Sequence, residues 1–99
     1  MSRVIHKYLM QDLRATHRMP LGSQFLSVSK DPQSNVAMYF DVDPDEKQEE
    51  TRTFWGVFTG RPVQDDSLFM GTLMTDGLMV HVFELFNRHL RKTIGSIKR

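Results

Sequence analysis

The acidic segment that begins at Asp41 contains part of the spacing that a calcium-binding loop requires. Asp41, Asp43 and Asp45 alternate along the chain, as the first ligands of an EF-hand loop do. Such a loop also needs a glycine at its sixth position and a bidentate glutamate at its twelfth, whereas this chain has Glu46 and Arg52 there. We therefore expect a solvated acidic loop and no metal site.

The histidines are also spaced unlike metal ligands. His6, His17, His81 and His89 form neither an H-x-H nor an H-E-x-x-H pattern. His81 and Glu84 are three residues apart in an expected strand, so their side chains point to opposite faces and cannot share a ligand. We expect His81 to be partly buried and hydrogen-bonded within the sheet.

Residue types that support covalent catalysis are absent or poorly placed. The chain has no cysteine, which excludes disulfide scaffolds, thiolate zinc sites, iron–sulfur clusters and cysteine nucleophiles. No serine lies in a nucleophile-elbow pattern, and no glycine-rich run could cradle a phosphate. The adjacent Asp65 and Asp66 are more typical of a turn than of a catalytic pair. We therefore predict a non-enzymatic protein with no cofactor.

Trp55 and the arginines near it could bind an anionic or aromatic ligand. Strand alternation places Phe54 and Phe58 on one face with Arg52, and Trp55 on the other face. Core packing accounts for the two phenylalanines, whereas Trp55 is compatible either with the core or with a ligand or partner contact. The candidate residues for anion or ligand binding are Arg52, Trp55, Arg61, Arg88, Arg91 and Lys92.

Charge is divided unevenly along the 99 residues. Residues 1–30 carry five basic side chains and one acid, residues 31–86 three basic side chains and eleven acids, and residues 87–99 five basic side chains and no acid. The net charge of +1 therefore hides an acidic body between two basic ends, and an acidic body suits a basic surface on another protein better than duplex DNA. The candidate partner-binding residues are Asp41, Asp43, Asp45, Glu46, Glu49, Glu50, Asp65 and Asp66.

Length and hydropathy favour one intracellular domain. Domains usually hold about 100–200 residues, so a chain of this size forms one. No apolar run approaches the roughly 20 residues of a membrane span. Charges are scattered through residues 1–14, which does not fit the apolar core of a signal peptide. We expect a location in the cytoplasm of the host cell and no membrane contact.

Alternating apolar, aromatic and β-branched residues predict a chain made mainly of strands. The strands expected before residue 60 are 4–9, 24–29, 36–42 and 51–59. Residues 11–17 are ambiguous between a loop and one weak helical turn, and the charged segment 43–50 and the polar segment 60–67 are expected loops.

The segment 68–85 contains the clearest local signal. Asp76-Gly77 is suited to a two-residue type I′ turn between two apolar strands. The register that follows pairs Met74 with Met79, Thr72 with His81, and Met70 with Phe83. The three methionines of this register share one face, which is either ordinary core or an adaptable interface with a second copy of the chain.

After residue 85 the period of the pattern changes to that of a helix. Phe86, Leu90, Ile94 and Ile97 recur every three or four residues, and basic residues occupy the other positions. This segment could dock on the sheet with its charges solvated, mediate self-association, or contact an anionic partner. The predicted fold is mainly β: a small antiparallel sandwich or barrel of five to six strands (1–85), with a basic amphipathic C-terminal α-helix (86–99) packed on it or extending from it.

Several short motifs follow one another in a characteristic order. They are Val4-Ile5-His6-Lys7-Tyr8, Met19-Pro20-Leu21-Gly22, Leu26-Ser27-Val28, Val42-Asp43-Pro44, Thr51-Arg52-Thr53-Phe54, Thr59-Gly60-Arg61-Pro62, Gly71-Thr72 and His81-Val82-Phe83-Glu84. With this order, over about residues 3–84, the chain resembles a family of small uncharacterised proteins of tailed bacteriophages and prophages. The resemblance implies a phage origin and a compact β-rich fold, but no activity. Members of that family usually end near the position of Glu84, so the basic tail looks like an addition.

These features predict a phage accessory protein that binds and inhibits a host protein, as a counter-defence factor does. Its acidic loops would compete for a basic surface on that protein. One alternative is an oligomeric sponge for a nucleotide signal, in which arginines and Trp55 supply phosphate and stacking contacts. A second is an OB-like protein that binds single-stranded nucleic acid.

Overall fold

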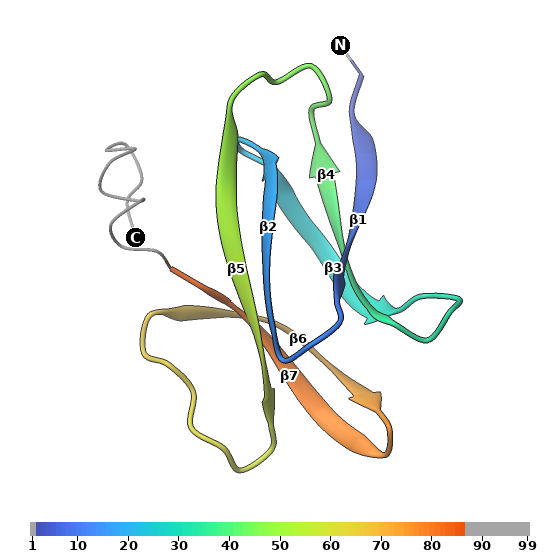
Figure 1. Ribbon diagram of the computed structural model, residues 1–99, viewed down its shortest axis with the longest axis vertical. Coiled ribbons are helices and arrows are strands. Elements are labelled where there is room, and N and C mark those ends of the chain that lie inside the picture. The colour runs from blue at the N-terminus through green and yellow to red at the C-terminus, as the bar shows by residue number, and fades with distance from the viewer. Residues whose placement is uncertain (1, 87–99) are drawn as a thin grey trace.

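The computed structural model describes residues 2–86 of the chain (Figure 1). This range contains seven strands. The strands are β1 (Val4–Met10), β2 (Arg14–Pro20), β3 (Gln24–Lys30), β4 (Val36–Val42), β5 (Glu49–Phe58), β6 (Ser67–Thr75) and β7 (Leu78–Leu85). No helix that could span a membrane occurs in this part of the chain. The helix predicted over 86–99 lies outside the described residues, apart from its first residue, Phe86.

The strands form two antiparallel sheets with the hydrophobic core between them. One sheet has the order β1-β4-β3 and the other the order β2-β5-β7-β6. Consecutive strands often belong to different sheets, since the chain passes from β1 to β2 and from β2 to β3 by changing layer (Figure 1). The predicted mainly-β fold is confirmed, but it has seven strands rather than five or six.

Strand β2 lies where the sequence is ambiguous between a loop and a helical turn. Arg14, Thr16 and Arg18 are exposed, and the residues between them point toward the core. Of the inward side chains only Met19 is both large and apolar, so the alternation of hydropathy is weak in the sequence although the alternation of burial is clear. Pro20 is tolerated because β2 is an edge strand.

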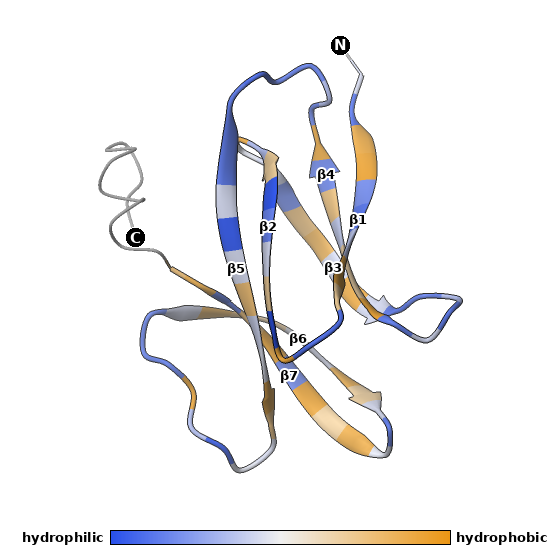
Figure 2. Cartoon of the chain, in the orientation of Figure 1, coloured by the Kyte–Doolittle hydropathy of each residue, from blue (hydrophilic) through white to orange (hydrophobic). Residues whose placement is uncertain are grey.

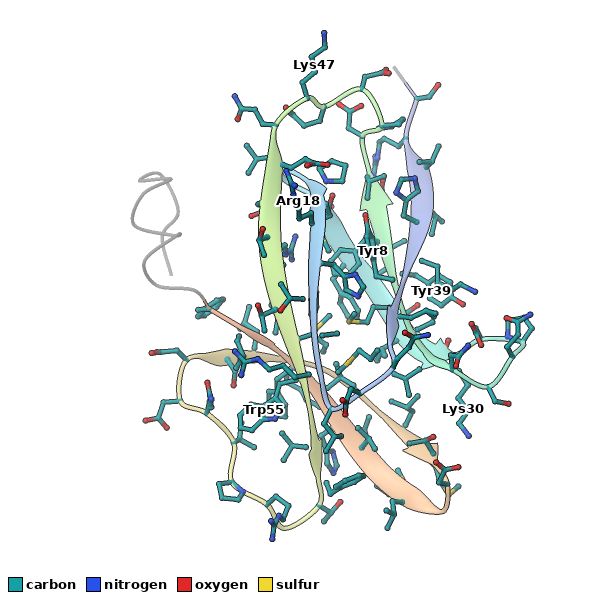
Figure 3. The ribbon with its side chains drawn as sticks, in the orientation of Figure 1. Tyr8, Arg18, Lys30, Tyr39, Lys47 and Trp55 are labelled. Carbon is teal, nitrogen blue, oxygen red and sulfur yellow. The ribbon has the colours of Figure 1, made fainter. Side chains whose placement is uncertain are left out.

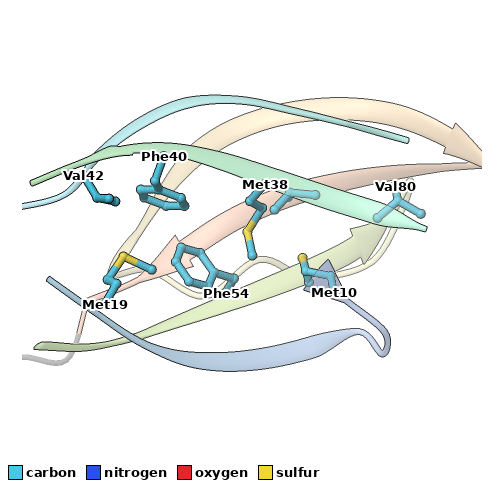
Figure 4. Close-up of a cluster of buried hydrophobic side chains, with 8 residues drawn as sticks. Met10, Met19, Met38, Phe40, Val42, Phe54 and Val80 are labelled. Atoms are coloured by element: carbon cyan, nitrogen blue, oxygen red, sulfur yellow. The ribbon is translucent and has the colours of Figure 1, made fainter. Parts of the chain in front are cut away.

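The core is a cluster of buried side chains from both sheets (Figure 4). Its members are Met10, Met19, Met38, Phe40, Val42, Phe54, Val80 and Val82. Phe40 of β4 and Phe54 of β5 meet edge to face, with ring centroids 5.7 Å apart. Burying a side chain of this size stabilises a fold by about 1.5–3 kcal/mol. Because Phe54 points inward, its neighbour Trp55 must point to the outside of the sheet.

The β6–β7 hairpin has the predicted turn but only part of the predicted register. Asp76 and Gly77 both have positive φ angles, 52° and 76°, as a type I′ turn requires. The pairs Met74–Met79 and Thr72–His81 are confirmed.

The third predicted pair of the hairpin, Met70 with Phe83, is wrong. An irregularity in β6 between Phe69 and Gly71 inserts one residue, so that Phe69 pairs with Phe83. Met70 therefore packs against the core and not beside Met74 and Met79, and its place on the outside of the sheet is taken by Phe69.

Gly71 lies where β6 passes close to β3 of the other sheet. A Cβ atom built on Gly71 would lie 2.7 Å from Cγ1 of Val28 in β3, a separation that real Cβ atoms do not show. The residue must therefore be glycine for β6 to lie this close to β3.

We expect G71A to destabilise the protein by about 1–3 kcal/mol, because the added methyl group forces a shift in a packed region. Equilibrium urea unfolding measures the change. The same substitution in a V28A background should cost clearly less, since V28A removes the atom that the methyl group meets. An equal cost in both backgrounds would show that the contact between the sheets is not the cause.

Candidate functional site

The outside of the β2-β5-β7-β6 sheet carries the candidate site, and we call it the outer face. The pairing register of the strands determines which side chains form rows across this face. Trp55, Phe83 and Phe69 lie side by side on β5, β7 and β6, and Arg14 of β2 lies opposite Trp55. The next row holds Val57, His81 and Thr72, and Met79 and Met74 lie beyond it near the hairpin turn. The hydrophobic colour in Figure 2 continues along β6 and β7 toward that turn.

This face exposes large apolar side chains to solvent. Phe69 is 61% exposed, Met74 59% and Met79 44%. Phe69 and Phe83 stack edge to face with centroids 5.5 Å apart, so the aromatic surface is continuous across two strands. Contiguous exposed apolar patches on a small domain usually mark a binding surface.

His81 lies in the middle of the outer face and is held there by two threonines. Nε2 is 2.8 Å from Oγ1 of Thr59, and Nδ1 is 2.9 Å from Oγ1 of Thr72. The expectation of a partly buried histidine that is hydrogen-bonded within the sheet is confirmed. Because both ring nitrogens are engaged, His81 orders the face and is not placed to ligate a metal.

The loop that joins β5 to β6 creates two hollows beside these rows. The first, which we call the Trp55 pocket, has a volume of about 420 Å³. It is lined by Leu13, Trp55, Gly56, Val57, Phe58, Arg61 and Pro62. Figure 3 shows Trp55 between β5 and this loop. Two of the predicted ligand-binding residues, Trp55 and Arg61, therefore share one largely apolar hollow.

The second hollow, which we call the Asp65 groove, lies where the chain leaves β7. Its volume is about 520 Å³. It is lined by Arg14, Thr53, Gln64, Asp65, Asp66, Leu85 and Phe86. The backbone N–H of Phe86 donates a hydrogen bond of 2.9 Å to the carbonyl of Asp66, so the loop is tied to the end of the strand. The groove places the predicted partner-binding acids Asp65 and Asp66 beside the outer face.

Arg52, the third predicted ligand-binding residue, points the other way. Its Nε and Nη2 donate to the two carboxylate oxygens of Glu84 at 2.6 and 2.8 Å, and Nη1 donates to the carbonyl of Ser23 at 2.6 Å. The guanidinium also lies 5.0 Å from the centre of the Phe40 ring and 3.6 Å from a carboxylate oxygen of Glu50. With a side chain only 11% exposed, Arg52 belongs to the fold, and we remove it from the ligand candidates.

The ionisation of this cluster follows from its partners. Burial alone would lower the pKa of Arg52, but the hydrogen bonds and charge of Glu84, with the charge of Glu50, raise that pKa above its ordinary value. Burial also raises the pKa of Tyr8, and the negative charge of Glu49 adds to this effect. Arg52 and Tyr8 therefore both keep their protons at neutral pH.

Most acids of the predicted partner-binding set have roles within the domain. Asp41 pairs with Arg3, Glu49 with Arg18, and Glu50 accepts a hydrogen bond from the backbone N–H of Gly22.

The acids in the loop before β5 organise that loop. Asp43 accepts from the backbone N–H of Asp45, and Glu46 accepts from that of Gln48. No cluster of three potential metal ligands occurs within residues 2–86. The loop is therefore ordered by its own carboxylates, with the exposed Asp45 near its tip.

The structure also adds residues to the candidate site and its surroundings that the sequence patterns did not indicate. Phe69 and Phe83 complete the aromatic row, and Glu84 is the partner of Arg52. Phe69 reaches the outer face only because of the irregularity in β6, for which the sequence has no distinct signal. The candidates Arg88, Arg91 and Lys92 lie outside the described residues.

Comparison with known proteins places this chain in a family. A family model described as a domain of unknown function, DUF7352, matches residues 1–92. The chain belongs to the DUF7352 family. The match continues past Glu84, so the first part of the basic segment lies inside the domain as the family model defines it. No curated protein and no solved structure matches the chain.

We predict that R52M destabilises the domain by about 3–5 kcal/mol, because it leaves the buried carboxylate of Glu84 without its cation. The matched control is R18M on the neighbouring strand. Arg18 also pairs with a glutamate but is 76% exposed, so its loss should cost no more than about 1 kcal/mol. Urea unfolding measures both. The double variant R52M/E84M should recover much of the loss, and equal effects of R52M and R18M would refute the structural role of Arg52.

Proposed function

We propose that this protein is a non-enzymatic phage accessory protein that binds a host protein in the cytoplasm and inhibits it. The phage origin rests on the family resemblance of the sequence motifs. The observation that carries the binding role is the outer face, which exposes Phe69, Met74 and Met79 and also holds the half-buried Phe83 and Trp55. Aromatic residues and methionine are the types enriched in the buried centres of protein interfaces.

The composition of this face supports a protein partner. Methionine side chains adapt their shape to an irregular surface, and aromatic rings bury a large area at a small cost in conformational entropy. Polar groups that would fix one small substrate are engaged within the sheet, as His81 is with its two threonines. The face is thus suited to burial against another folded surface.

The acidic side chains would then act at the rim of the contact. Asp65 and Asp66 border the outer face beside the Asp65 groove, and Asp45 lies on the distant loop before β5. Charges at a rim mainly accelerate and orient association and contribute less to final affinity. The partner would bind the apolar face and be attracted by the nearby acids. We therefore expect its surface to have apolar residues bordered by basic ones.

We expect F69D to reduce retention of the host partner by more than about tenfold in co-precipitation from host lysate, because it places a charge among the exposed apolar side chains of the outer face. The matched control is I5D on β1, whose side chain is 65% exposed but lies on the other sheet. I5D should retain the partner as the unmodified chain does. If the two variants behave alike, or if the unmodified chain retains no protein, the proposal is wrong.

A second candidate, a binder of small nucleotides, is favoured by the Trp55 pocket alone. An indole ring and the guanidinium of Arg61 in one hollow could stack a base and pair with a phosphate. Native mass spectrometry with a mixture of nucleoside mono- and triphosphates should then show a bound mass that R61M abolishes and R18M does not. An unliganded spectrum of the unmodified chain would exclude this candidate.

A further inference from the structure

Strand β6 is an edge strand that lacks the usual protection against pairing. Within residues 2–86, each sheet ends in two edge strands, β1 and β3 in one sheet and β2 and β6 in the other. Charged side chains and proline commonly prevent a free edge from pairing with another strand. Strand β1 carries Lys7, β2 carries Arg18 and β3 carries Lys30. The nine residues of β6, by contrast, include no charged residue and no proline.

The hairpin turn determines which backbone groups of β6 face the free edge. In a two-residue type I′ hairpin, the residues on either side of the turn, here Thr75 and Leu78, exchange hydrogen bonds with each other. Hydrogen-bonded and non-hydrogen-bonded pairs then alternate along an antiparallel ladder. Met74 and Thr72 therefore form non-hydrogen-bonded pairs with β7, and the N–H and C=O groups of these two residues point away from β7.

Strand β3 packs against the inner side of β6 and does not pair with its edge. Cγ1 of Val28 lies 2.7 Å from the position that a Cβ atom of Gly71 would take, and no strand pairing joins β3 to β6. Leu68 faces the same inner side but is 48% exposed, and Phe69 is 61% exposed on the outer face. Strand β6 therefore presents apolar side chains on both of its faces beside an unpaired edge.

A second copy of the chain suits this edge because β6 is compatible with itself. Two identical strands that pair about a two-fold axis place each residue opposite a residue of the same strand. Like charges that face each other across a ladder are destabilising, and β6 has no charges to oppose. Self-pairing of β1, β2 or β3 would instead bring together two copies of a strand that carries a cation. The neutrality of β6 thus favours a symmetric partner, and it offers no charge to attract a strand of opposite sign.

We propose that two copies of this chain associate through β6, with the two strands antiparallel about a two-fold axis at Leu73. Thr72 of each copy then lies opposite Met74 of the other copy, and their edge-facing N–H and C=O groups exchange hydrogen bonds. The pairing joins two four-stranded sheets into one continuous sheet. Both outer faces lie on the same side of it, so their apolar surfaces adjoin and stay accessible. The inference goes beyond the proposed function, because it concerns the edge of the sheet and a copy of the same chain.

Sedimentation velocity of the purified full-length protein tests this association, because the proportion of dimer should rise with protein concentration. We expect T72P to raise the dissociation constant of the dimer by at least about tenfold, since it removes one edge-facing donor from each copy. Proline is tolerated at this position of an edge strand because the N–H that it removes makes no bond to β7.

The matched control is T72V, which loses the same hydroxyl contact with His81 as T72P does but keeps the backbone N–H. It should change the dissociation constant by less than about twofold. A chain that stays monomeric at every concentration would overturn the proposal and leave the edge to another segment or another protein. A dimer that T72P and T72V weaken equally would overturn it as well.

Disulfide formation tests the register without relying on proline, because the chain has no cysteine of its own. An equimolar mixture of T72C and M74C should form disulfide-linked dimers on mild oxidation, since opposed residues of a hydrogen-bonded pair have Cα atoms about 5.5 Å apart. Either variant alone should form far fewer, because its two cysteines would lie more than about 7 Å apart. Equal cross-linking of the mixture and of the single variants would refute the register. All these measurements use purified protein, so their outcome is independent of whether a host partner is found.

Discussion

The ion pair between Arg52 and Glu84 holds together the parts of the domain on which the outer face depends. It joins β5 to β7, and through the carbonyl of Ser23 it fastens the connection between β2 and β3 to the same point. The guanidinium lies over Phe40 of the other sheet, so one side chain links both layers. A buried charge pair is stable only when its hydrogen bonds are satisfied, and here both oxygens of the glutamate receive one.

The inward orientation of Arg52 determines what the opposite side of β5 presents. Because side chains alternate along a strand, Arg52 and Phe54 point inward and Thr53 and Trp55 point outward. The same separation into inward and outward side chains extends to β7, which pairs with β5, and to β6, which pairs with β7. The polar groups of the domain are thus largely engaged in holding the fold, while an aromatic and methionine surface is left for contact. This distribution of side chains is the basis of the binding role proposed for the outer face.

Many acidic residues that give the sequence its acidic body have structural partners in the folded domain. Asp31 illustrates this point: its carboxylate accepts hydrogen bonds from Lys7 and from the backbone N–H groups of Gln33 and Asn35, which lower its pKa and order the β3–β4 turn. Asp43, Glu46, Glu49 and Glu50 are also engaged nearby in the chain or across strands. Much of the negative charge of the chain therefore stabilises local structure.

The sequence alone determined the mainly-β composition, the type I′ turn at Asp76-Gly77 and the inward face of β5, because these follow from local alternation and turn chemistry. It also indicated the hydrogen-bonded role of His81. Only the tertiary structure decided that β2 is a strand, that Phe69 replaces Met70 on the outer face, and that Arg52 is an internal cation. In each case the cause lies in residues that are distant along the chain. Strand β2 forms because it pairs with β5, and the irregularity that turns Phe69 outward fits the packing of β6 against β3. Arg52 is internal because its partner Glu84 lies on β7, opposite Phe54 and far from Arg52 in sequence. Pairing and close packing between such segments have no local signature, so they emerge only when the sheets assemble.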